Sequence, residues 1–506
     1  MKSNIFWRSL SPLIATILLI VVSVILIAIV VTWGSNFTSS SLSSTKDLLV
    51  EDVDLTGFIF VRHLSNNIFN IRNASDKEVT FTKYQILSSE ELDLTNTDLT
   101  FKEPIVLSSG ATSSLPIICV PEGSFSISLI TDQDKYVNVN INNILGSTND
   151  WCEMTLIGDG SESDPYKIYN VFQLNDVREH YDEGSYFNLE KNIDFDWISL
   201  SEFSDISGFE DYDTNGWEPI GYDWSDYFEG NFDGKGNTIK NLYIYRPSQN
   251  NIGLFGFVEN SEINNLGVVD VNITGKSSVG GIIGRSLENI MSYSFSKGRI
   301  IGDASVGGLI GVSGDTEILY SFADIYVSGS FYLGGLIGDA ANGPNGVIDN
   351  CYSKGVIDAS SLTSFYSSGG LVGILAGELY NSYSEVDIID VINALVFAGG
   401  LIGSTTDDMG DIYISNVYSF GAISGTGTLS GLIGEYWDPI LVHTINSYWN
   451  TETSGQATSA GGEGKTTEEM KQRSTYVGWD FDTVWQIQEG VTYPYLRSNP
   501  QSPPPQ

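Results

Sequence analysis

Cysteine, histidine and basic residues are scarce in this chain of 506 residues. It has three cysteines and three histidines, and its 24 Lys plus Arg face 63 Asp plus Glu, which gives a formal net charge of −39 at pH 7. Three cysteines are too few for a disulfide scaffold. The histidines (His63, His180 and His443) stand alone and no cysteine pair has ligand spacing, which argues against a zinc site. So acidic a surface repels nucleic acid and anionic lipid headgroups, which argues against both as partners.

Helical periodicity and nucleotide-binding loops are nearly absent as well. Gly234 and Gly236 form a Gly-x-Gly pair, but this pair follows an acidic strand and precedes no helix, so it does not predict a dinucleotide site. The chain instead has 53 glycines and many short runs in which apolar and polar residues alternate. Such runs are typical of β-strands. We therefore predict a mainly β protein, long enough for about three structural units.

One long apolar run lies near the N-terminus, at 10–33, and contains no charged residue. As a helix rising about 1.5 Å per residue, it would cross a hydrocarbon layer of roughly 30 Å. Lys2 and Arg8 precede the run and the next basic residue is Lys46, so the positive-inside rule keeps 1–9 in the cytoplasm. We therefore expect a transmembrane helix that anchors the chain in the cytoplasmic membrane and exposes everything after it at the cell surface.

The junction ahead of this run is a short basic leader followed by Ser-Pro-Leu-Ile-Ala-Thr at 11–16. It resembles the start of archaeal type IV pilin-like proteins. In that family a peptidase cuts before the apolar helix, and the retained helix can pack into the core of a filament. The resemblance implies cleavage between Ser9 and Leu10, and identical or related pilin subunits as partners. The family usually has Gly or Ala before the cut, where this chain has Ser9, and an ordinary signal-anchor helix is the alternative.

Two further segments separate the helix from the repeats described below. Residues 34–50 are rich in Ser and Thr and predict a linker that does not fold alone. From 51 to 150 short alternating runs predict a small antiparallel β-sandwich, a domain that pilin-like subunits often carry. Cys119 and Cys152 could form a disulfide outside the cell. The glycosylation sequons are at Asn36, Asn73 and Asn272.

The strongest internal signal is the pattern Gly-Gly-aliphatic-aliphatic-Gly, which recurs from 252 to 434 in five full copies and, at 252–256 and 430–434, in two degenerate copies. Seven copies at a near-constant period indicate a repeat architecture, and short strands that stack copy on copy predict a parallel β-solenoid. The glycines would mark tight corners, where a side chain would clash or φ must be positive. The second glycines of the seven copies are Gly253, Gly281, Gly308, Gly335, Gly370, Gly400 and Gly431.

A second landmark, Tyr followed by Ser, keeps step with the glycines. Its copies are Tyr293-Ser294, Tyr320-Ser321, Tyr352-Ser353, Tyr383-Ser384, Tyr418-Ser419 and the variant Tyr448-Trp449. Together with the opening coils at 151–251, the pattern resembles the GLUG repeats of large surface β-solenoid proteins. Cys351 occupies the slot that Ser382 holds in the next copy, so we expect it to be a small buried residue.

The solenoid would need a cover at its C-terminal end. Residues 435–497 would form this cap, with apolar bulk from Trp479, Phe481 and Trp485. The proline-rich tail at 498–506 is expected to be disordered.

The best candidate for a binding site is 192–234, which contains twelve Asp and Glu, eleven aromatic residues and no basic residue. Its aromatic rings could stack on sugars, and its carboxylates could bind Ca²⁺. Alternatively, the aromatic residues cap the first coil and the carboxylates are solvated. The glycan candidates are Trp197, Trp217, Tyr222, Trp224 and Tyr227, and the calcium candidates are Asp205, Asp211, Asp213, Asp223 and Asp226.

The sequence as a whole favours a pilin-like subunit or membrane-anchored adhesin, not an enzyme, that attaches to surfaces, glycans or other cells through a β-solenoid. One alternative is a surface-anchored solenoid that binds or cleaves polysaccharide; cleavage would require Arg or Lys beside carboxylates in a groove. Another is a structural component of the cell envelope.

Overall fold

The computed structural model describes strands between 59 and 144 and most of the chain from 155 to 506. The later part lacks 182–183, 196–207, 210, 363–365, 393–394, 407–409 and 500. The predicted membrane helix at 10–33 with its cleavage point, the linker, Asn36, Cys119 and Cys152 lie outside the described residues. In the part that is described, no helix has the length and apolar character needed to cross a membrane.

The strands between 59 and 144 form two antiparallel sheets. Alternation of apolar and polar residues directs one face of each strand inward, and Ile71, Phe81 and Leu129 are fully buried. The three-stranded sheet has the order β1 (Ile59–Ser65), β2 (Ile68–Asn73) and β5 (Thr112–Pro116). The four-stranded sheet has the order β4 (Leu99–Leu107), β3 (Val79–Ser88), β6 (Gly123–Thr131) and β7 (Tyr136–Ile144).

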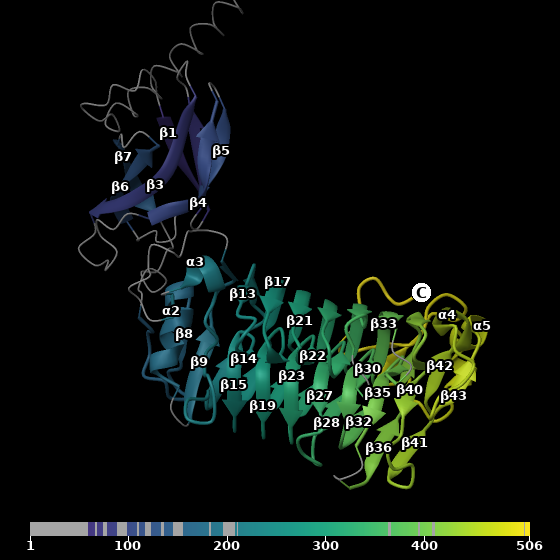
Figure 1. Cartoon of the computed structure of the whole chain (residues 1–506). Coiled ribbons are helices and arrows are strands. Elements are labelled where there is room, and N and C mark those ends of the chain that lie inside the picture. Colours follow the sequence, from purple (N-terminus) through teal and green to yellow (C-terminus); the bar gives the residue numbers. More distant parts are fainter. Residues whose placement is uncertain are drawn as a thin grey trace, which may run out of the picture.

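The chain from 166 to 465 forms the predicted parallel β-solenoid, in which four sheets run along the stack of coils (Figure 1). The twelve-stranded sheet contains β10 (Ile193–Asp194), β12 (Thr238–Lys240), β13 (Tyr243–Tyr245), β17 (Gly267–Thr274), β21 (Phe295–Ile301), β25 (Phe322–Ser328), β29 (Tyr352–Asp358), β33 (Tyr383–Val391), β37 (Tyr418–Ser419), β38 (Ile423–Gly425), β42 (Tyr448–Asn450) and β43 (Glu463–Lys465). The ten-stranded sheet contains β8 (Tyr166–Ile168), β9 (Ser185–Leu189), β11 (Gly230–Asp233), β16 (Glu262–Asn264), β20 (Ile290–Ser292), β24 (Glu317–Leu319), β28 (Val347–Asp349), β32 (Glu378–Tyr380), β36 (Ile412–Ser415) and β41 (Val442–Ile445).

Two seven-stranded sheets complete each coil. The first contains β14 (Asn250–Ile252), β18 (Ser277–Val279), β22 (Ala304–Gly307), β26 (Leu333–Gly334), β30 (Ser367–Gly369), β34 (Phe397–Gly399) and β39 (Thr428–Ser430). The second contains β15 (Phe255–Glu259), β19 (Ile283–Leu287), β23 (Ile310–Gly314), β27 (Ile337–Ala340), β31 (Val372–Leu375), β35 (Ile402–Thr405) and β40 (Ile433–Glu435). We number seven coils, from coil 1 (β11 to β15) to coil 7 (β36 to β40).

Short helices and one hairpin flank the coils. They are α2 (Val171–Asp176), η3 (Val177–Glu179), α3 (Tyr212–Asn215), α4 (Thr451–Ser454), α5 (Thr467–Met470), η5 (Arg473–Thr475) and the antiparallel pair β44 (Trp485–Gln486) and β45 (Tyr495–Leu496).

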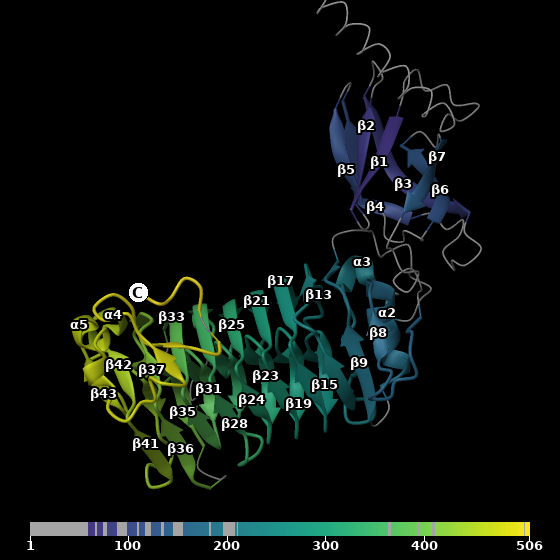
Figure 2. The same ribbon diagram turned by 180° about the vertical axis from the view of Figure 1, so that it is seen from behind.

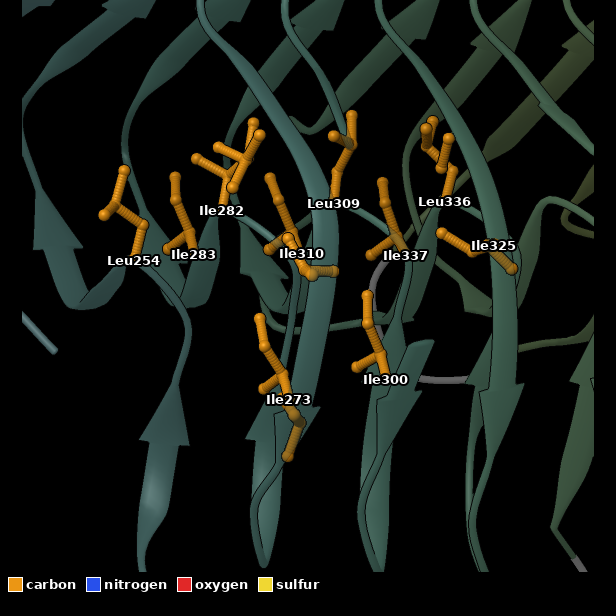
Figure 3. Packing of buried hydrophobic residues seen from close by; sticks show 14 of the residues in the cluster. Leu254, Ile273, Ile282, Ile283, Ile300, Leu309, Ile310, Ile325, Leu336 and Ile337 are labelled. Atoms are coloured by element: carbon orange, nitrogen blue, oxygen red, sulfur yellow. The ribbon is translucent and has the colours of Figure 1, made fainter. Parts of the chain in front are cut away.

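Aliphatic side chains fill the solenoid axis in columns (Figure 3). Parallel strands in register place the same repeat position of each coil over the last, roughly 4.8 Å apart, so each aliphatic side chain packs on its own copy. One column from the glycine motif contains Leu254, Ile282, Leu309 and Leu336, and the neighbouring column contains Ile283, Ile310 and Ile337. Ile273 and Ile300 face them from the twelve-stranded sheet. All are buried, which is what a repeated apolar pair in every coil achieves.

The second glycine of the repeat is required by close approach of backbones in coils 1 to 6, and in coil 7 by the ring of Trp449, which would lie 2.0 Å from a Cβ on Gly431. None of the seven has a positive φ. A Cβ built on Gly335 would instead lie 2.0 Å from the carbonyl oxygen of Gly370 in the next coil, and one on Gly308 would lie 2.1 Å from that of Gly335. The sequence left open whether these glycines are needed for a positive φ or because a side chain would clash. The clash is the reason that applies.

The first and third glycines let the two seven-stranded sheets meet backbone to backbone. A Cβ on Gly311 would lie 2.3 Å from the backbone nitrogen of Val279, and one on Gly307 would lie 2.6 Å from that of Gly338. A side chain at these places would collide with the facing backbone, and the five inner copies have glycine at all three places of the motif, whereas the first and last copies have Ile252 and Ser430 at the first place.

The Tyr-Ser landmark combines two different positions of the coil, which corrects the sequence prediction. Strand register pairs Phe322 with Tyr352, so Tyr320 lies level with Asn350 and not with Tyr352. Tyr293 and Tyr320 occupy a corner with φ of +48° and +49°. The later tyrosines instead belong to an outward column that starts with Phe295 and Phe322. Sequence spacing failed here because Tyr-Ser pairs occur at both positions.

The serines that follow the outward aromatic residues point inward and hold the glycine motif. Ser353 Oγ donates to the carbonyl of Gly370 at 2.6 Å, and Ser419 Oγ donates to that of Gly431 at 2.7 Å. Each such bond ties the twelve-stranded sheet to a glycine corner and satisfies a buried hydroxyl. Cys351 is a buried free thiol in the slot of Ser382, as expected.

The C-terminal segment does more than cover the last coil (Figure 2). The backbone around 458–460 bonds to the last glycine motif, and β43 extends the twelve-stranded sheet. Trp479, Phe481 and Trp485, the predicted cap residues, are buried in one aromatic cluster with residues of earlier coils, which include Tyr383 and Tyr418. The segment therefore runs back along the outer face of the sheet.

The tail at 498–506 docks on this face, which contradicts the prediction of disorder. Asn499 Nδ2 donates to the carbonyls of Ser321 and Asn350, at 3.2 and 3.3 Å. The hydroxyl of Tyr383 donates to Gln501 Oε1 at 2.9 Å. Composition suggested disorder, because proline has no backbone N–H to donate within a sheet. The amide side chains of Asn499 and Gln501 are nevertheless buried, and they pair with polar groups on the surface of the solenoid.

Candidate binding surface at the first coils

The acidic and aromatic stretch at 192–234 packs onto the start of the solenoid. Trp197 and Asp205 lie outside the described residues. Beyond them, Ile220 bridges to Phe255 and Phe228 bridges to Val258, both in parallel, so the chain extends the seven-stranded sheet of coil 1 by a partial turn. This addition covers the open end of the repeats, as the alternative interpretation of the stretch proposed.

Trp217 is part of the core, which corrects its assignment to a glycan surface. Its side chain is 0% exposed, and the indole nitrogen donates to the carbonyl of Leu254 at 3.1 Å. The ring centroid lies 5.4 Å from that of Phe195 and 6.0 Å from that of Phe209. A buried indole with its N–H bonded offers no face to a sugar.

Asp211 is neutralised by an arginine from outside the stretch, which corrects its assignment to a calcium site. Arg246 is buried and donates to both oxygens of Asp211, at 2.7 and 3.2 Å. It also donates to the carbonyl of Trp217 at 3.2 Å. Burial acts to raise the pKa of Asp211, but hydrogen bonds from Asn215 and Arg246 outweigh it and leave that pKa lowered.

Asp223 and Asp226 lie in one tight hairpin, and each accepts a hydrogen bond from another side chain. Asp223 Oδ1 accepts from the backbone N–H of Ser225 at 2.8 Å and from its hydroxyl at 2.7 Å, and these bonds lower the pKa of Asp223. Asp226 accepts a hydrogen bond from the hydroxyl of Tyr181. Burial, and then this bond, raise the pKa of Tyr181 well above its usual value.

The calcium candidates do not form one site. The side chain of Asp213 is outside the described part, and Asp211 is paired with Arg246. Only Asp223 and Asp226 come together, as bridge partners. Over the residues that the structure describes, no group of three or more His, Cys, Asp or Glu side chains could hold a metal ion.

The same hairpin presents two exposed aromatic rings. Tyr222 is 55% exposed and Trp224 is 60% exposed. The Trp224 ring rests edge-on against the buried Phe257, at a centroid distance of 4.6 Å, and the guanidinium of Arg285 lies 5.1 Å from its centroid. Tyr227 is half-buried against Phe257 at 5.7 Å. An exposed indole beside a cation is suited to stacking on a sugar ring.

Arg285 is the residue of this surface that sequence reasoning missed. Arg285 lies on β19 of coil 2, whereas Trp224 lies in the hairpin that precedes coil 1, and no sequence motif links the two residues. Arg285 also acts to lower the pKa of Asp339, which burial raises. The register of the seven-stranded sheet, in which Phe257 pairs with Arg285, is the signal that could have found it.

The remaining predicted positions are dispersed. Asn272 is exposed on β17, so this sequon is accessible; Asn73 ends β2, and its side chain is not described. Two of the histidines lie beside carboxylates: His180 Nε2 is 3.4 Å from Asp176 Oδ2, and His443 Nε2 is 3.6 Å from Asp411 Oδ1.

No family model matches this chain. A Gly-rich membrane protein of Evansella cellulosilytica is 32% identical over 412 residues, which cover 67% of this chain and 45% of that protein. Halomucin of Haloquadratum walsbyi is 30% identical over 154 residues, which cover 29% of this chain and 2% of that protein. The chain therefore spans less than half the length of the curated relatives it matches.

Two solved structures are similar at a distance. One, from Bacteroides ovatus, carries the name immunoglobulin A1 protease; it has a TM-score of 0.40 and 20% identity and covers 67% of this chain and 94% of that one. The other, named IgA1 protease, has a TM-score of 0.46 and 14% identity and covers 89% of this chain and 31% of that one. These likenesses are too weak to carry functional information.

Proposed function

We propose that the chain is a pilin-like protein of the cell surface, anchored by the helix at 10–33, that displays a GLUG-type β-solenoid as a non-enzymatic adhesive or spacer. The observation that carries the proposal is the solenoid itself, with seven coils locked by glycine contacts at three positions in most copies. Such a stack is stiff, about 30 Å long from coil spacing alone, and exposes the outer faces of its sheets along its length.

Three further features support an external location. The apolar run follows a basic leader, which orients the chain outward. A net charge of −39 suits a solvated surface protein. The relatives named above are a membrane protein and a halomucin. The proposal includes no calcium site, because Asp211, Asp223 and Asp226 are held by Arg246, Ser225 and Tyr181.

Imaging of intact cells with an antibody to the solenoid tests this role. We expect surface label on unpermeabilised cells, arranged as filaments if the helix assembles with related pilin subunits and as a diffuse coat if it serves as an anchor. Label that appears only after permeabilisation would contradict a surface role.

A second candidate function is polysaccharide binding at the hairpin that precedes coil 1. Exposed Tyr222 and Trp224, with Arg285 beside the indole, favour it. Attachment of Trp224→Ala cells to glycan-coated surfaces should fall, whereas the half-buried Tyr227→Phe, which keeps its ring, should attach normally. Equal attachment of the Trp224→Ala variant and the wild type would remove this candidate.

A further inference from the structure

A column of aromatic side chains runs along the outer face of the twelve-stranded sheet. Phe295, Phe322, Tyr352, Tyr383 and Tyr418 come from coils 3 to 7 and stack face to face. Their successive centroids are 4.7 to 5.1 Å apart, and the ring planes differ by at most 13°. The column faces outward because the next residue in each strand, such as Ser353, points into the core.

The C-terminal segment covers this column over coils 5 to 7. Tyr352, Tyr383 and Tyr418 are buried there against the cluster that contains Trp485. Phe322 is only partly buried against that cluster, and Phe295 is half-buried one coil beyond it. The column therefore emerges from its cover at coils 3 and 4.

The same two coils carry tyrosine at a strained corner. Tyr293 and Tyr320 have φ of +48° and +49°, a region in which bulky residues are outliers and asparagine is the favoured side chain. Their equivalents in coil 2, in coils 5 to 7 and after β41 are asparagines with positive φ, namely Asn265, Asn350, Asn381, Asn416 and Asn446, whereas coil 1 has Gly234 at this place. Strain that is kept at two adjacent coils, where asparagine would relieve it, points to a use for the rings.

The two tyrosines form an accessible platform. Their rings stack with centroids 4.7 Å apart and planes 7° apart, and Tyr293 is 50% exposed. In coil 2 the residue at this place is Asn265, so the stack of two tyrosine rings ends at Tyr293. The face of the Tyr293 ring that points away from Tyr320 therefore has no aromatic ring from coil 2 stacked on it.

Two cations continue this surface along β21. The Lys297 ammonium lies 5.6 Å from the centroids of both Phe295 and Phe322. Arg299 is exposed, and its guanidinium lies 4.2 Å from the ring of Tyr326 in coil 4. Because alternate residues of a strand share a face, β21 presents Phe295, Lys297 and Arg299 together. We call these three residues with Tyr293 and Tyr320 the coil 3–4 strip.

We propose that the coil 3–4 strip binds an acidic polysaccharide. The tyrosine rings would stack on sugar faces, while Lys297 and Arg299 would pair with carboxylate or sulfate groups. Cations beside rings favour an acidic glycan over a neutral one. Duplex DNA, with one charge per roughly 1.7 Å, would be repelled much more strongly by a chain of net charge −39. This inference rests on the proposed surface role, because the strip meets such polymers only outside the cell.

Affinity electrophoresis of the full chain, in native gels that contain polygalacturonate or neutral dextran, tests the proposal. We expect retardation by polygalacturonate only, weakened by salt.

Tyr293→Asn and the double variant Lys297→Gln/Arg299→Gln should each bind at least about fivefold more weakly, the loss expected for a central contact. Tyr293→Asn should melt at or above the wild-type temperature, because it installs the asparagine that occupies this corner in coils 2 and 5 to 7. Tyr413→Asn, which removes a 40% exposed ring from the ten-stranded sheet, is the matched control and should bind normally.

Three results would overturn the proposal. They are equal wild-type mobility in both gels, unaltered binding by Tyr293→Asn and the double variant, and a lower melting temperature for Tyr293→Asn, which would make the tyrosine a packing residue. If polygalacturonate does not bind while intact cells still carry the surface label, only the strip fails and the proposed surface role stands.

Discussion

Glycine at three positions of the repeat sets how closely the backbones of the solenoid approach. Its role is steric, because a Cβ at any of these positions in coil 4 would meet backbone atoms at 1.8 to 2.5 Å. The aliphatic pair between the glycines fills the axis, and the inward serines bond to the glycine carbonyls. At the scale of single residues, the fold thus depends on small side chains where backbones meet.

Gly335→Val should therefore destabilise the solenoid strongly. The new side chain would collide with the carbonyl of Gly370, which belongs to the backbone of the next coil and cannot move alone. We expect a loss of roughly 3–5 kcal/mol in the free energy of unfolding, measured by thermal melts. Ser330→Val, in the half-buried turn between β25 and β26, is the control and should change the free energy of unfolding by only about 0.5 kcal/mol. Equal melting temperatures would refute the steric role of the glycine.

Cys351→Ser should be nearly neutral. The thiol donates to the carbonyls of Ile318 and Asp349 at 3.3 Å, and Ser382 makes the matching bond to Tyr380 in the next coil. Burial raises the pKa of the Cys351 thiol well above its usual value, so the group stays protonated. We expect a cost below about 1 kcal/mol in denaturant melts, whereas Cys351→Leu should cost about 1–3 kcal/mol through overpacking. A serine variant as unstable as the leucine variant would contradict this.

Asp211→Ala should destabilise the first coils, since it leaves the buried Arg246 without its carboxylate. A broken buried pair costs about 3–5 kcal/mol, and the partial exposure of Asp211 reduces our expectation to roughly 2–3 kcal/mol. Because the folded-state pKa of Asp211 is lowered, its contribution is present above the unfolded pKa of about 3.9 and is lost as the pH falls through the folded value.

The measurement is thermal unfolding at pH 7 and at pH 2–3. The difference between wild type and Asp211→Ala should be large at pH 7 and shrink in acid. Asp223→Ala, which removes bonds within one exposed hairpin, should change the melting temperature little at either pH. If the difference in melting temperature between wild type and Asp211→Ala is the same at both pH values, the ion pair is not its cause.

At the scale of elements, strand register separates what the sequence could predict from what it could not. The period of the glycine motif predicts a parallel β-solenoid, because each copy repeats the same steric requirement. The Tyr-Ser landmark gave a wrong alignment of the coils, because it matched Tyr320 with Tyr352, whereas strand pairing matches Tyr352 with Phe322, two residues later. The Arg246 pair, the burial of Trp217 and the position of Arg285 depend on contacts about 30 to 60 residues apart, for which the chain has no local signal.

The docked tail gives a prediction at this scale. Deletion of 498–506 removes at least five hydrogen bonds: two from Asn499, two between Gln501 and the side chains of Tyr383 and Glu385, and one that the carbonyl of Pro505 accepts from the backbone of Tyr493. At about 0.5–1 kcal/mol per bond, we expect a loss of roughly 3–5 kcal/mol in the free energy of unfolding, measured by thermal or denaturant melts. Deletion of the exposed Gln506 alone is the control and should have no effect. An unchanged melting temperature after deletion of 498–506 would mean that the tail does not dock in solution.

At the scale of the whole molecule, the solenoid is a rod with one outer face partly covered by its own C-terminus. The covered coils 5 to 7 are stabilised by an aromatic cluster, and coils 3 and 4, at and beyond the edge of this cover, present rings and cations. The exposed hairpin that precedes coil 1 adds a second aromatic surface. A stiff rod with separate exposed surfaces suits attachment outside the cell, which is why the N-terminal run at 10–33 is central to the account.

The most direct test of that account is the N-terminal sequence of the mature protein, isolated from the membranes of cells that produce it. A pilin-like protein should begin at Leu10, because cleavage after Ser9 removes the basic leader and keeps the apolar helix. A mature chain that begins at Met1 would contradict pilin-type processing, and one that begins beyond Trp33 would show that no helix is retained as an anchor.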